Sequence, residues 1–302
     1  MKLTILGCYA ATPRTFTNPT SQVLEINGEL FLIDCGEGTQ VELRRKKVKF
    51  SKIKHIFISH LHGDHFFGLI GLISTFMLLG RETELHIYGP KGIKDLIILQ
   101  LKMSNSWTQY PLYFHELHSK EPEVILETKK VTVETIPLNH RIYANGFLFR
   151  EKPADRKLLI DKVEDYGIDV AYYKSIKKGK DITLENGEVV PNSKLTSDPE
   201  PPKSYAFCSD TAYSPQIVEQ IKGITALYHE STFLEEHAYL GAPTGHSTAR
   251  EAAAIAREAE VGILILGHYS TRYNSIQPFK EEASEVFPNV ILSDDGKLIN
   301  LD

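Results

Sequence analysis

His60-Leu61-His62-Gly63-Asp64-His65 is the most informative stretch of this chain, because it places four potential metal ligands within six positions. It follows directly on Ile56-Phe57-Ile58-Ser59, an apolar segment typical of a strand. Alternate residues of an extended chain point to opposite sides, so a turn at the strand end can direct the first two histidines to one ion and the aspartate and last histidine to a second. We therefore expect a two-metal site, which suits the hydrolysis of phosphate esters.

The composition is that of an ordinary globular protein of 302 residues, long enough to bury a full core in one large domain. No apolar run approaches the ~20 residues that span a bilayer, and Met1–Gly7 is typical of a strand and not of a signal peptide. Cys8, Cys35 and Cys208 have no close spacing, as expected of buried thiols in a reducing compartment. These features predict a cytoplasmic enzyme with no membrane segment.

The net charge of −5 is mildly negative, but the basic residues are clustered. Between Arg44 and Lys54 there are seven basic residues and no acidic one. A second run, Tyr172–Lys180, combines two tyrosines with four lysines: Lys174, Lys177, Lys178 and Lys180. Either run alone is equally well explained as a solvated surface. Two such runs flanking a metal site favour a polyanionic substrate.

Short apolar and β-branched runs recur in both halves of the chain, with helical patterns among them. The expected strands are 2–7, 22–26, 30–34, 55–59, 84–88, 131–137, 147–150, 204–209, 226–230 and 262–267. The expected helices are 37–47, 67–79, 93–101, 215–221, 248–260 and 278–286. This order predicts an α/β fold in which two sheets pack together with the helices outside them.

Residues 151–203 differ from both halves, because they are charged, poor in core residues and closed by Asp198-Pro199-Glu200-Pro201-Pro202. Alternation around Asn186-Gly187 predicts a hairpin within Asp181–Val190. We interpret this segment as an arm inserted into a catalytic domain that spans 1–302.

Three further candidate ligands come after apolar predicted strands: His140, Asp210 and His268. Any one of them, taken singly, is more often a loop residue than a ligand. Their shared position beyond a strand favours a common site. There His140 would complete a three-histidine set for the first ion, Asp210 would bridge both ions with its two oxygens, and His268 would serve the second ion.

Several motifs carry a resemblance to a known family. The 60–65 run is shared by the metallo-β-lactamase superfamily as a whole. More specific are His229-Glu230-Ser231-Thr232, Gly245-His246-Ser247-Thr248 and Gly267-His268-Tyr269-Ser270-Thr271-Arg272-Tyr273. With 34–40, 137–140 and 208–211, these motifs extend over nearly the whole chain. On them the chain resembles the short-form ribonuclease Z enzymes, which remove 3′ trailers from precursor tRNA.

The resemblance implies an αββα metallo-β-lactamase sandwich with two zinc ions per subunit, manganese or another divalent metal being the alternative. Its ligand set is His60, His62 and His140 on one ion, Asp64, His65 and His268 on the other, and Asp210 between them. It also implies that Asp64 accepts the proton of the attacking water. His246, oriented by Glu230, would protonate the leaving ribose 3′ oxygen. In the alternative interpretation, Glu230 and His246 are a buried ion pair that only holds two loops.

The resemblance further implies that the arm binds precursor tRNA and that the protein is a homodimer in which the arm of one subunit serves the active site of the other. Candidate substrate-binding residues are Lys174, Lys177, Lys178, Lys180 and Arg272. The arm departs from the family pattern at 168–173, where relatives have a Gly-Pro-rich stretch. The apolar helix expected at 66–79 is a candidate interface or a core helix.

Other functions fit parts of the sequence. A thioester or lactam hydrolase of the same fold would lack the basic arm and the motifs around Glu230 and His246. A phosphodiesterase acting on small or cyclic phosphodiesters would share the metal chemistry and is the main alternative. A metal-free RNA-binding module would need a broken ligand set, whereas every expected ligand is present. We therefore expect a metal-dependent endoribonuclease that leaves a 3′-hydroxyl on the tRNA and a 5′-phosphate on the trailer.

Overall fold

The computed structural model describes residues 1–12 and 14–301. The chain forms two compact units. Met1–Arg150 and the chain from Lys203 onward make up the first, which we call the main unit. Glu151–Pro202 make up the second, the arm unit.

In the described part of the chain, one layer of the main unit is a seven-stranded sheet in the order β18-β1-β2-β3-β4-β5-β6. Its strands are β1 (Lys2–Gly7), β2 (Ser21–Ile26), β3 (Glu29–Ile33), β4 (Ile53–Phe57), β5 (Leu85–Pro90), β6 (Leu112–Leu117) and β18 (Leu298–Asn300). Neighbouring strands from β3 to β6 are parallel. Their carboxyl ends therefore lie at the same edge of the sheet, and the loop after β4 begins there.

A second sheet, again of seven strands among the described residues, has the order β17-β16-β15-β14-β9-β8-β7. Its strands are β7 (Val124–Glu127), β8 (Val131–Pro137), β9 (Asn145–Glu151), β14 (Ser204–Cys208), β15 (Ala226–Glu230), β16 (Ile263–Gly267) and β17 (Val290–Leu292). From β14 to β17 the neighbours are parallel, so the loops after β14, β15 and β16 also leave one edge together.

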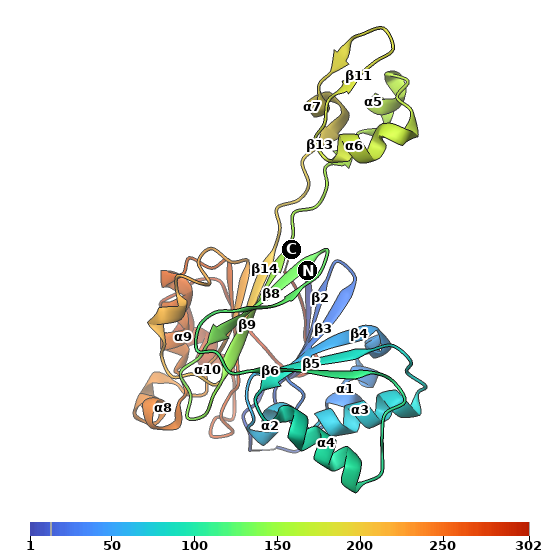
Figure 1. Cartoon of the computed structure of the whole chain (residues 1–302). Coiled ribbons are helices and arrows are strands. Elements are labelled where there is room, and N and C mark those ends of the chain that lie inside the picture. The colour runs from blue at the N-terminus through green and yellow to red at the C-terminus, as the bar shows by residue number, and fades with distance from the viewer. Residues whose placement is uncertain (13, 302) are drawn as a thin grey trace. The chain divides into compact units, whose positions relative to one another are not determined.

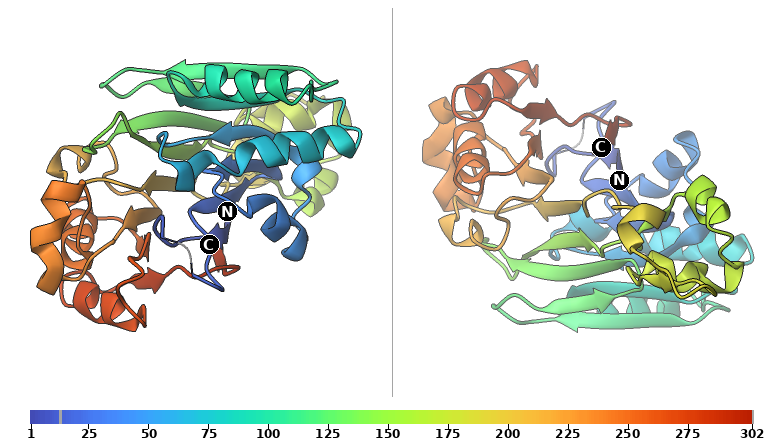
Figure 2. Two further views of the ribbon diagram at one scale, coloured as in Figure 1. Left: turned by 90° about the horizontal axis from the view of Figure 1, so that it is seen from below. Right: turned by 90° about the horizontal axis from the view of Figure 1, so that it is seen from above.

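The two sheets pack face to face, with helices on both outer surfaces (Figures 1 and 2). The helices on the first sheet are α1 (Thr39–Arg45), α2 (Gly63–Phe66), α3 (Leu69–Leu78) and α4 (Ile93–Met103). Those on the second sheet are α8 (Ala238–Thr244), α9 (Ala249–Glu258) and α10 (Gln277–Ser284). Single 3₁₀ turns lie at η1 (Phe50–Lys52), η3 (Pro215–Ile217) and η4 (Glu235–His237). The predicted two-sheet α/β arrangement is confirmed.

Large aromatic side chains fill the space between the sheets. The ring centroids of Phe31 and Phe57 are 6.3 Å apart, and that of Phe149 from the opposite sheet lies 5.5 and 5.3 Å from them. All three side chains are fully buried. Packing of this kind is worth about 0.5–1.5 kcal/mol per aromatic pair beyond the burial of area. It fixes the position of one sheet relative to the other, and therefore the position of the edges that carry the loops.

Some predicted elements are wrong at their ends or in kind. The helix expected at 37–47 begins only at Thr39, because Gly38 has a left-handed φ of 82°. The helix expected at 215–221 is a 3₁₀ turn at Pro215–Ile217 followed by irregular turns. Among the described residues, no helix combines the length and apolar character that a membrane span requires.

The arm unit contains short elements: β10 (Lys157–Leu158), α5 (Ile160–Asp165), η2 (Val170–Tyr172), α6 (Tyr173–Lys177), β11 (Ile182–Thr183), β12 (Val189–Val190), α7 (Asn192–Leu195) and β13 (Thr196–Ser197). The predicted hairpin is confirmed, since β11 pairs antiparallel with β12 and Gly187 takes the left-handed turn position at φ 85°. The segment is richer in core residues than expected, because it has its own buried cluster of Val163, Ile168, Ile176, Ile182, Val190 and Leu195.

Candidate metal centre

All seven predicted ligands come after strands of the main unit, five of them in loops and Asp64 and His65 in the short helix α2. The 60–65 run follows β4, His140 follows β8, Asp210 follows β14 and His268 follows β16. Asp210 and His268 have left-handed φ values of 56° and 60°, which non-glycine residues rarely adopt. Such turns directly after a strand redirect the side chain across the sheet edge. The loops of both sheets therefore converge at this edge.

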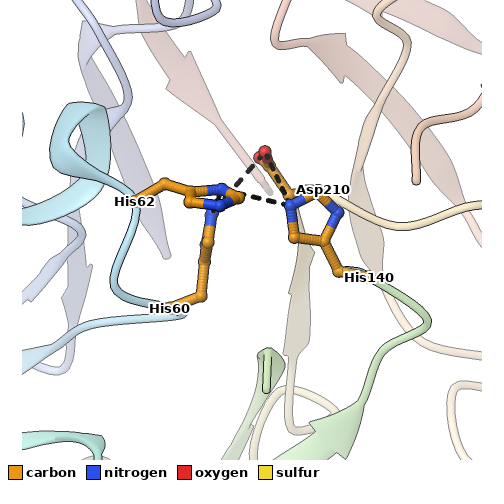
Figure 3. Close-up of side chains that lie close together, drawn as sticks. All are labelled: His60, His62, His140 and Asp210. Atoms are coloured by element: carbon orange, nitrogen blue, oxygen red, sulfur yellow. Dashed lines mark hydrogen bonds and ion pairs between the residues drawn. The ribbon is translucent and has the colours of Figure 1, made fainter. Parts of the chain in front are cut away.

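The first cluster contains three histidines and one oxygen of Asp210 (Figure 3). The Nδ1 atom of His62 lies 3.0 Å from Nε2 of His60 and 3.2 Å from Nε2 of His140. Asp210 Oδ2 is 3.7 Å from Nε2 of His60 and 3.9 Å from Nε2 of His140. One ligand atom from each residue thus lies within 4.8 Å of the others, close enough to surround a single ion.

The second cluster uses the other oxygen of Asp210. Its Oδ1 atom is 3.2 Å from Nε2 of His65 and 3.2 Å from Nε2 of His268. Asp64 Oδ2 lies 3.3 Å from the same atom of His65 and 3.8 Å from that of His268. Asp210 therefore presents one oxygen to each cluster.

Two atoms test whether this donor set fits a cation. Nε2 of His65 and Nε2 of His268 are buried and have no hydrogen-bond partner among the described residues. A buried polar atom without a partner costs free energy, and both atoms point at carboxylate oxygens. A divalent cation between them would satisfy nitrogen and oxygen lone pairs together, so the residues fit a metal.

Residues behind the ligands fix their orientation. His65 Nδ1–H donates to Asp34 Oδ2 at 2.6 Å, and His140 Nδ1–H donates to the carbonyl oxygen of Gly245 at 2.8 Å. His268 Nδ1–H donates to Thr232 Oγ1 at 2.8 Å. Because Nδ1 carries the proton in each ring, Nε2 is left to bind a cation. Asp34 itself is held by the backbone N–H and the hydroxyl of Ser59 at 2.8 and 2.9 Å.

The charges of the centre favour cation binding. Burial by itself would raise the pKa of Asp210, but the histidines around it, His268 first, hold that pKa well below its usual range. Burial lowers the pKa of His60 and of His140, so these rings are neutral near pH 7. Burial also opposes the charged form of His65, yet Asp210 and Asp34 hold its pKa well above the ordinary value. A bound cation would replace that proton.

Next to the clusters lies the pair of His246 and Glu230. Nδ1–H of His246 donates to Glu230 Oε1 at 2.8 Å. The buried carboxylate also accepts the backbone N–H of Thr211 at 2.9 Å and the hydroxyl of Thr232 at 2.6 Å. Burial lowers the pKa of His246, but the Glu230 carboxylate overcomes this effect and raises the pKa to about 9. His246 is therefore protonated near neutral pH, and its Nε2–H is available to a substrate.

The loop that carries His246 is itself anchored. Ser247 Oγ donates to the carbonyl oxygen of Thr211 at 2.7 Å. Thr248 and Glu251 form a capping box at the start of α9, with bonds of 3.1 and 2.8 Å. The imidazole is thus held against Asp210, with Nδ1 of His246 4.0 Å from Oδ2.

The other predicted site residues are not members of these clusters. Arg272 is near a separate cavity of about 620 Å³, which is also lined by Glu281, Glu282 and Glu285. The four lysines of the 172–180 run are exposed in the arm unit. Conversely, the sequence pattern assigned no role to Asp34, Ser59 or Thr232. The one available signal was an acidic residue, Asp34, directly after an apolar strand.

Comparison with known proteins adds independent findings. The model of the family described as Anti-Pycsar protein Apyc1 matches residues 1–173. A protein named Ribonuclease Z from Bacteroides thetaiotaomicron is 47% identical over 300 residues, which cover 99% of this chain and 95% of that protein. The crystal structure of human tRNase Z, short form, superposes with a TM-score of 0.74 at 26% identity and covers 100% of both chains.

A further structural neighbour shares the fold alone. The metallo-β-lactamase fold protein YhfI from Bacillus subtilis has a TM-score of 0.68 at 20% identity and covers 99% of this chain and 98% of its own. The αββα main unit is therefore a metallo-β-lactamase fold.

Replacing Asp34 by asparagine tests the orientation of the ligands. Asparagine tolerates the left-handed φ of 55° at this position but removes the negative charge that holds His65 Nδ1–H. We expect metal affinity, measured by competition with a chromogenic chelator, to fall about 10- to 100-fold. The melting temperature of the metal-free variant serves as control for folding. Unchanged affinity would show that Asp34 does not support the centre.

Proposed function

The chain belongs to the ribonuclease Z family and is a metal-dependent endoribonuclease of tRNA 3′-end processing, and on this premise we propose how its residues perform the reaction. Residues 1–173 also belong to the family described as Anti-Pycsar protein Apyc1. That match ends before Asp210, Glu230, His246 and His268, whereas the ribonuclease Z relatives extend over 99% of the chain. We propose cleavage that leaves a 3′-hydroxyl on the tRNA and a 5′-phosphate on the trailer.

The proposal is carried by one observation, the convergence of six imidazole and carboxylate ligands around the two oxygens of Asp210. We propose that two zinc ions are bound there, since histidine nitrogen and carboxylate oxygen are zinc ligands. His60, His62 and His140 would hold one ion, and Asp64, His65 and His268 the other. When bound, two adjacent divalent ions lower the pKa of a water and neutralise charge on the scissile phosphate.

The protein residues would move two protons in this reaction. Asp64 is ionised, since His65 and His268 lower its pKa in spite of its burial, and it would accept a proton from the attacking water. As the new P–O bond forms, the bond from phosphorus to the ribose 3′ oxygen breaks. His246 would donate its Nε2 proton to that oxygen, and Glu230 would stabilise the charged imidazole.

We also propose a homodimer. One face of α3 belongs to the core, because Leu69, Leu72, Ile73 and Phe76 are buried. Large apolar side chains nevertheless remain exposed on α3, on α4 and in the segments beside them: Phe67, Leu78, Leu79, Leu96, Leu99, Met103 and Trp107. Since α3 and α4 pack together, these residues offer an apolar surface that a second copy of the chain would cover.

The arm unit supports binding of precursor tRNA. Its lysines 174, 177, 178 and 180 are exposed, and within the described residues none of them forms an ion pair. Phosphate contacts by such side chains supply sequence-independent affinity for RNA. Because the unit has its own buried cluster, it presents these lysines on a folded surface. We propose that the arm of one subunit serves the metal centre of the other.

We propose that the enzyme acts in the cytoplasm. Cys8, Cys35 and Cys208 are buried free thiols, as predicted. Free thiols are typical of proteins from reducing compartments.

The proposed function is tested by cleavage of a precursor tRNA. We expect about two zinc ions per chain after gentle purification, a cut that releases the trailer, and loss of cleavage on chelation that is reversed by zinc. Mapping of both product ends identifies the scissile bond. A zinc-loaded protein that hydrolyses small or cyclic phosphodiesters but leaves precursor tRNA intact would support the alternative phosphodiesterase function.

The role of His246 is tested by kinetics and pH dependence. Replacement by alanine should lower kcat about 10²- to 10⁴-fold with zinc content unchanged. In the wild type the acid form is lost as the pH rises through the pKa of about 9, so activity should fall there. In Glu230→Gln the supporting negative charge is gone, and this alkaline limb should move to lower pH. An unmoved limb would separate Glu230 from the proton transfer.

The arm and the dimer are tested together by mixing two defective variants. Replacing the arm lysines 174, 177, 178 and 180 by alanine should weaken cleavage of precursor tRNA far more than hydrolysis of a small phosphodiester. After subunit exchange with His246→Ala, activity should recover to about a quarter of wild type, because half of the dimers are mixed and each holds one working combination. Sedimentation confirms dimers in each sample. If the arm served its own subunit, mixing would restore nothing.

A further inference from the structure

A cavity distinct from the one beside Arg272 adjoins the metal centre. Its volume is about 460 Å³, within the range of small-molecule sites. The loop between β8 and β9 forms most of its wall, and the loop after β6 and Gln216 complete it. His140, which belongs to the first ligand cluster, is part of the same wall, so the cavity borders that cluster.

The charge of this cavity is one-sided. Among the described residues that line it, Arg141 and Lys120 are cationic and none is acidic. Both side chains are exposed, and neither has an ion pair or side-chain hydrogen bond in the described part of the chain. Two cationic side chains without an ion-pair partner favour an anionic ligand.

The walls of the cavity are fixed before any ligand arrives. The backbone N–H of Asn139 donates to Thr211 Oγ1 at 3.1 Å, and its carbonyl oxygen accepts the N–H of Ala212 at 2.8 Å. Tyr143 Oη donates to the carbonyl oxygen of Ser119 at 2.9 Å, which joins the two loops. Asn145 Nδ2 donates to the same tyrosine oxygen at 2.7 Å. A loop held in this way loses little entropy on binding.

We propose that this cavity binds a backbone phosphate of the RNA next to the scissile one, with Arg141 and Lys120 as its cationic donors. The proposal rests on the proposed function, because an RNA substrate presents a neighbouring backbone phosphate while the scissile phosphate lies in the metal centre. The guanidinium of Arg141 offers paired N–H donors that match two phosphate oxygens, and Lys120 adds a point charge. The site would position the RNA backbone and would not recognise any particular base.

Steady-state cleavage of a precursor tRNA tests the site. In Arg141→Ala we expect KM to rise on the order of tenfold, the usual loss for one charge-assisted contact, with a smaller change in kcat. Arg141→Lys should recover part of this loss, and Lys120→Ala should raise KM as well. The slope of log affinity against log salt should fall by about 0.7 for each lost phosphate contact. Lys222→Ala is the matched control, since this exposed lysine precedes β15 and lies at the opposite end of the strand from Glu230.

Trailer length locates the bound phosphate. A one-nucleotide trailer has no phosphate beyond the scissile one, so the effect of Arg141→Ala disappears with it if the phosphate belongs to the trailer and persists if it belongs to the tRNA. Either result supports the site. KM values and salt slopes equal to those of wild type in both alanine variants, with wild type cleaving normally, would overturn the site alone. A wild type that never cleaves precursor tRNA would overturn the proposed function and the site with it.

Discussion

The two oxygens of one buried carboxylate, Asp210, connect the two ligand clusters of the metal centre. Oδ2 faces His60 and His140, and Oδ1 faces His65 and His268. Each pair contains one histidine from the first sheet and one from the second. The clusters therefore form only while the two sheets keep their positions relative to each other, and the aromatic core between the sheets maintains these positions. Packing far from the chemistry is in this sense part of the site.

Several residues of the centre have backbone conformations that are energetically unfavourable. Asp34, Asp210 and His268 all have left-handed φ values, a conformation that costs roughly 1–3 kcal/mol for a non-glycine residue. Hydrogen bonds offset part of this cost, since Asp34 accepts three of them from Ser59 and His65. Thr232 joins the candidate ligands to the pair of His246 and Glu230, because its hydroxyl accepts from His268 and donates to Glu230. The candidate ligands and the His246–Glu230 pair thus share one hydrogen-bond network.

Regular patterns made part of the fold predictable. β1 and β8 have the predicted bounds, because their alternating or apolar residues match a strand that is buried on one or both faces. β6 was not predicted, since Leu112–Leu117 contains polar residues on the inner face, where His115 stacks on Tyr88 at 4.3 Å. The short strands β17 and β18 were also missed, because they pair only through tertiary contacts and have too few residues to show a period.

The amino-acid sequence alone determined which residues are candidate metal ligands, because a residue placed directly after a strand must emerge at the strand's carboxyl end. Only the tertiary structure decided what stands behind those ligands. Asp34 meets His65 across 31 positions and Thr232 meets His268 across 36, and no local period records such a contact. Likewise, only the fold brings Lys120 and Arg141 to one cavity and separates Arg272 from it. Hydrogen bonds and cavities depend on distances between loops, which arise when the sheets pack.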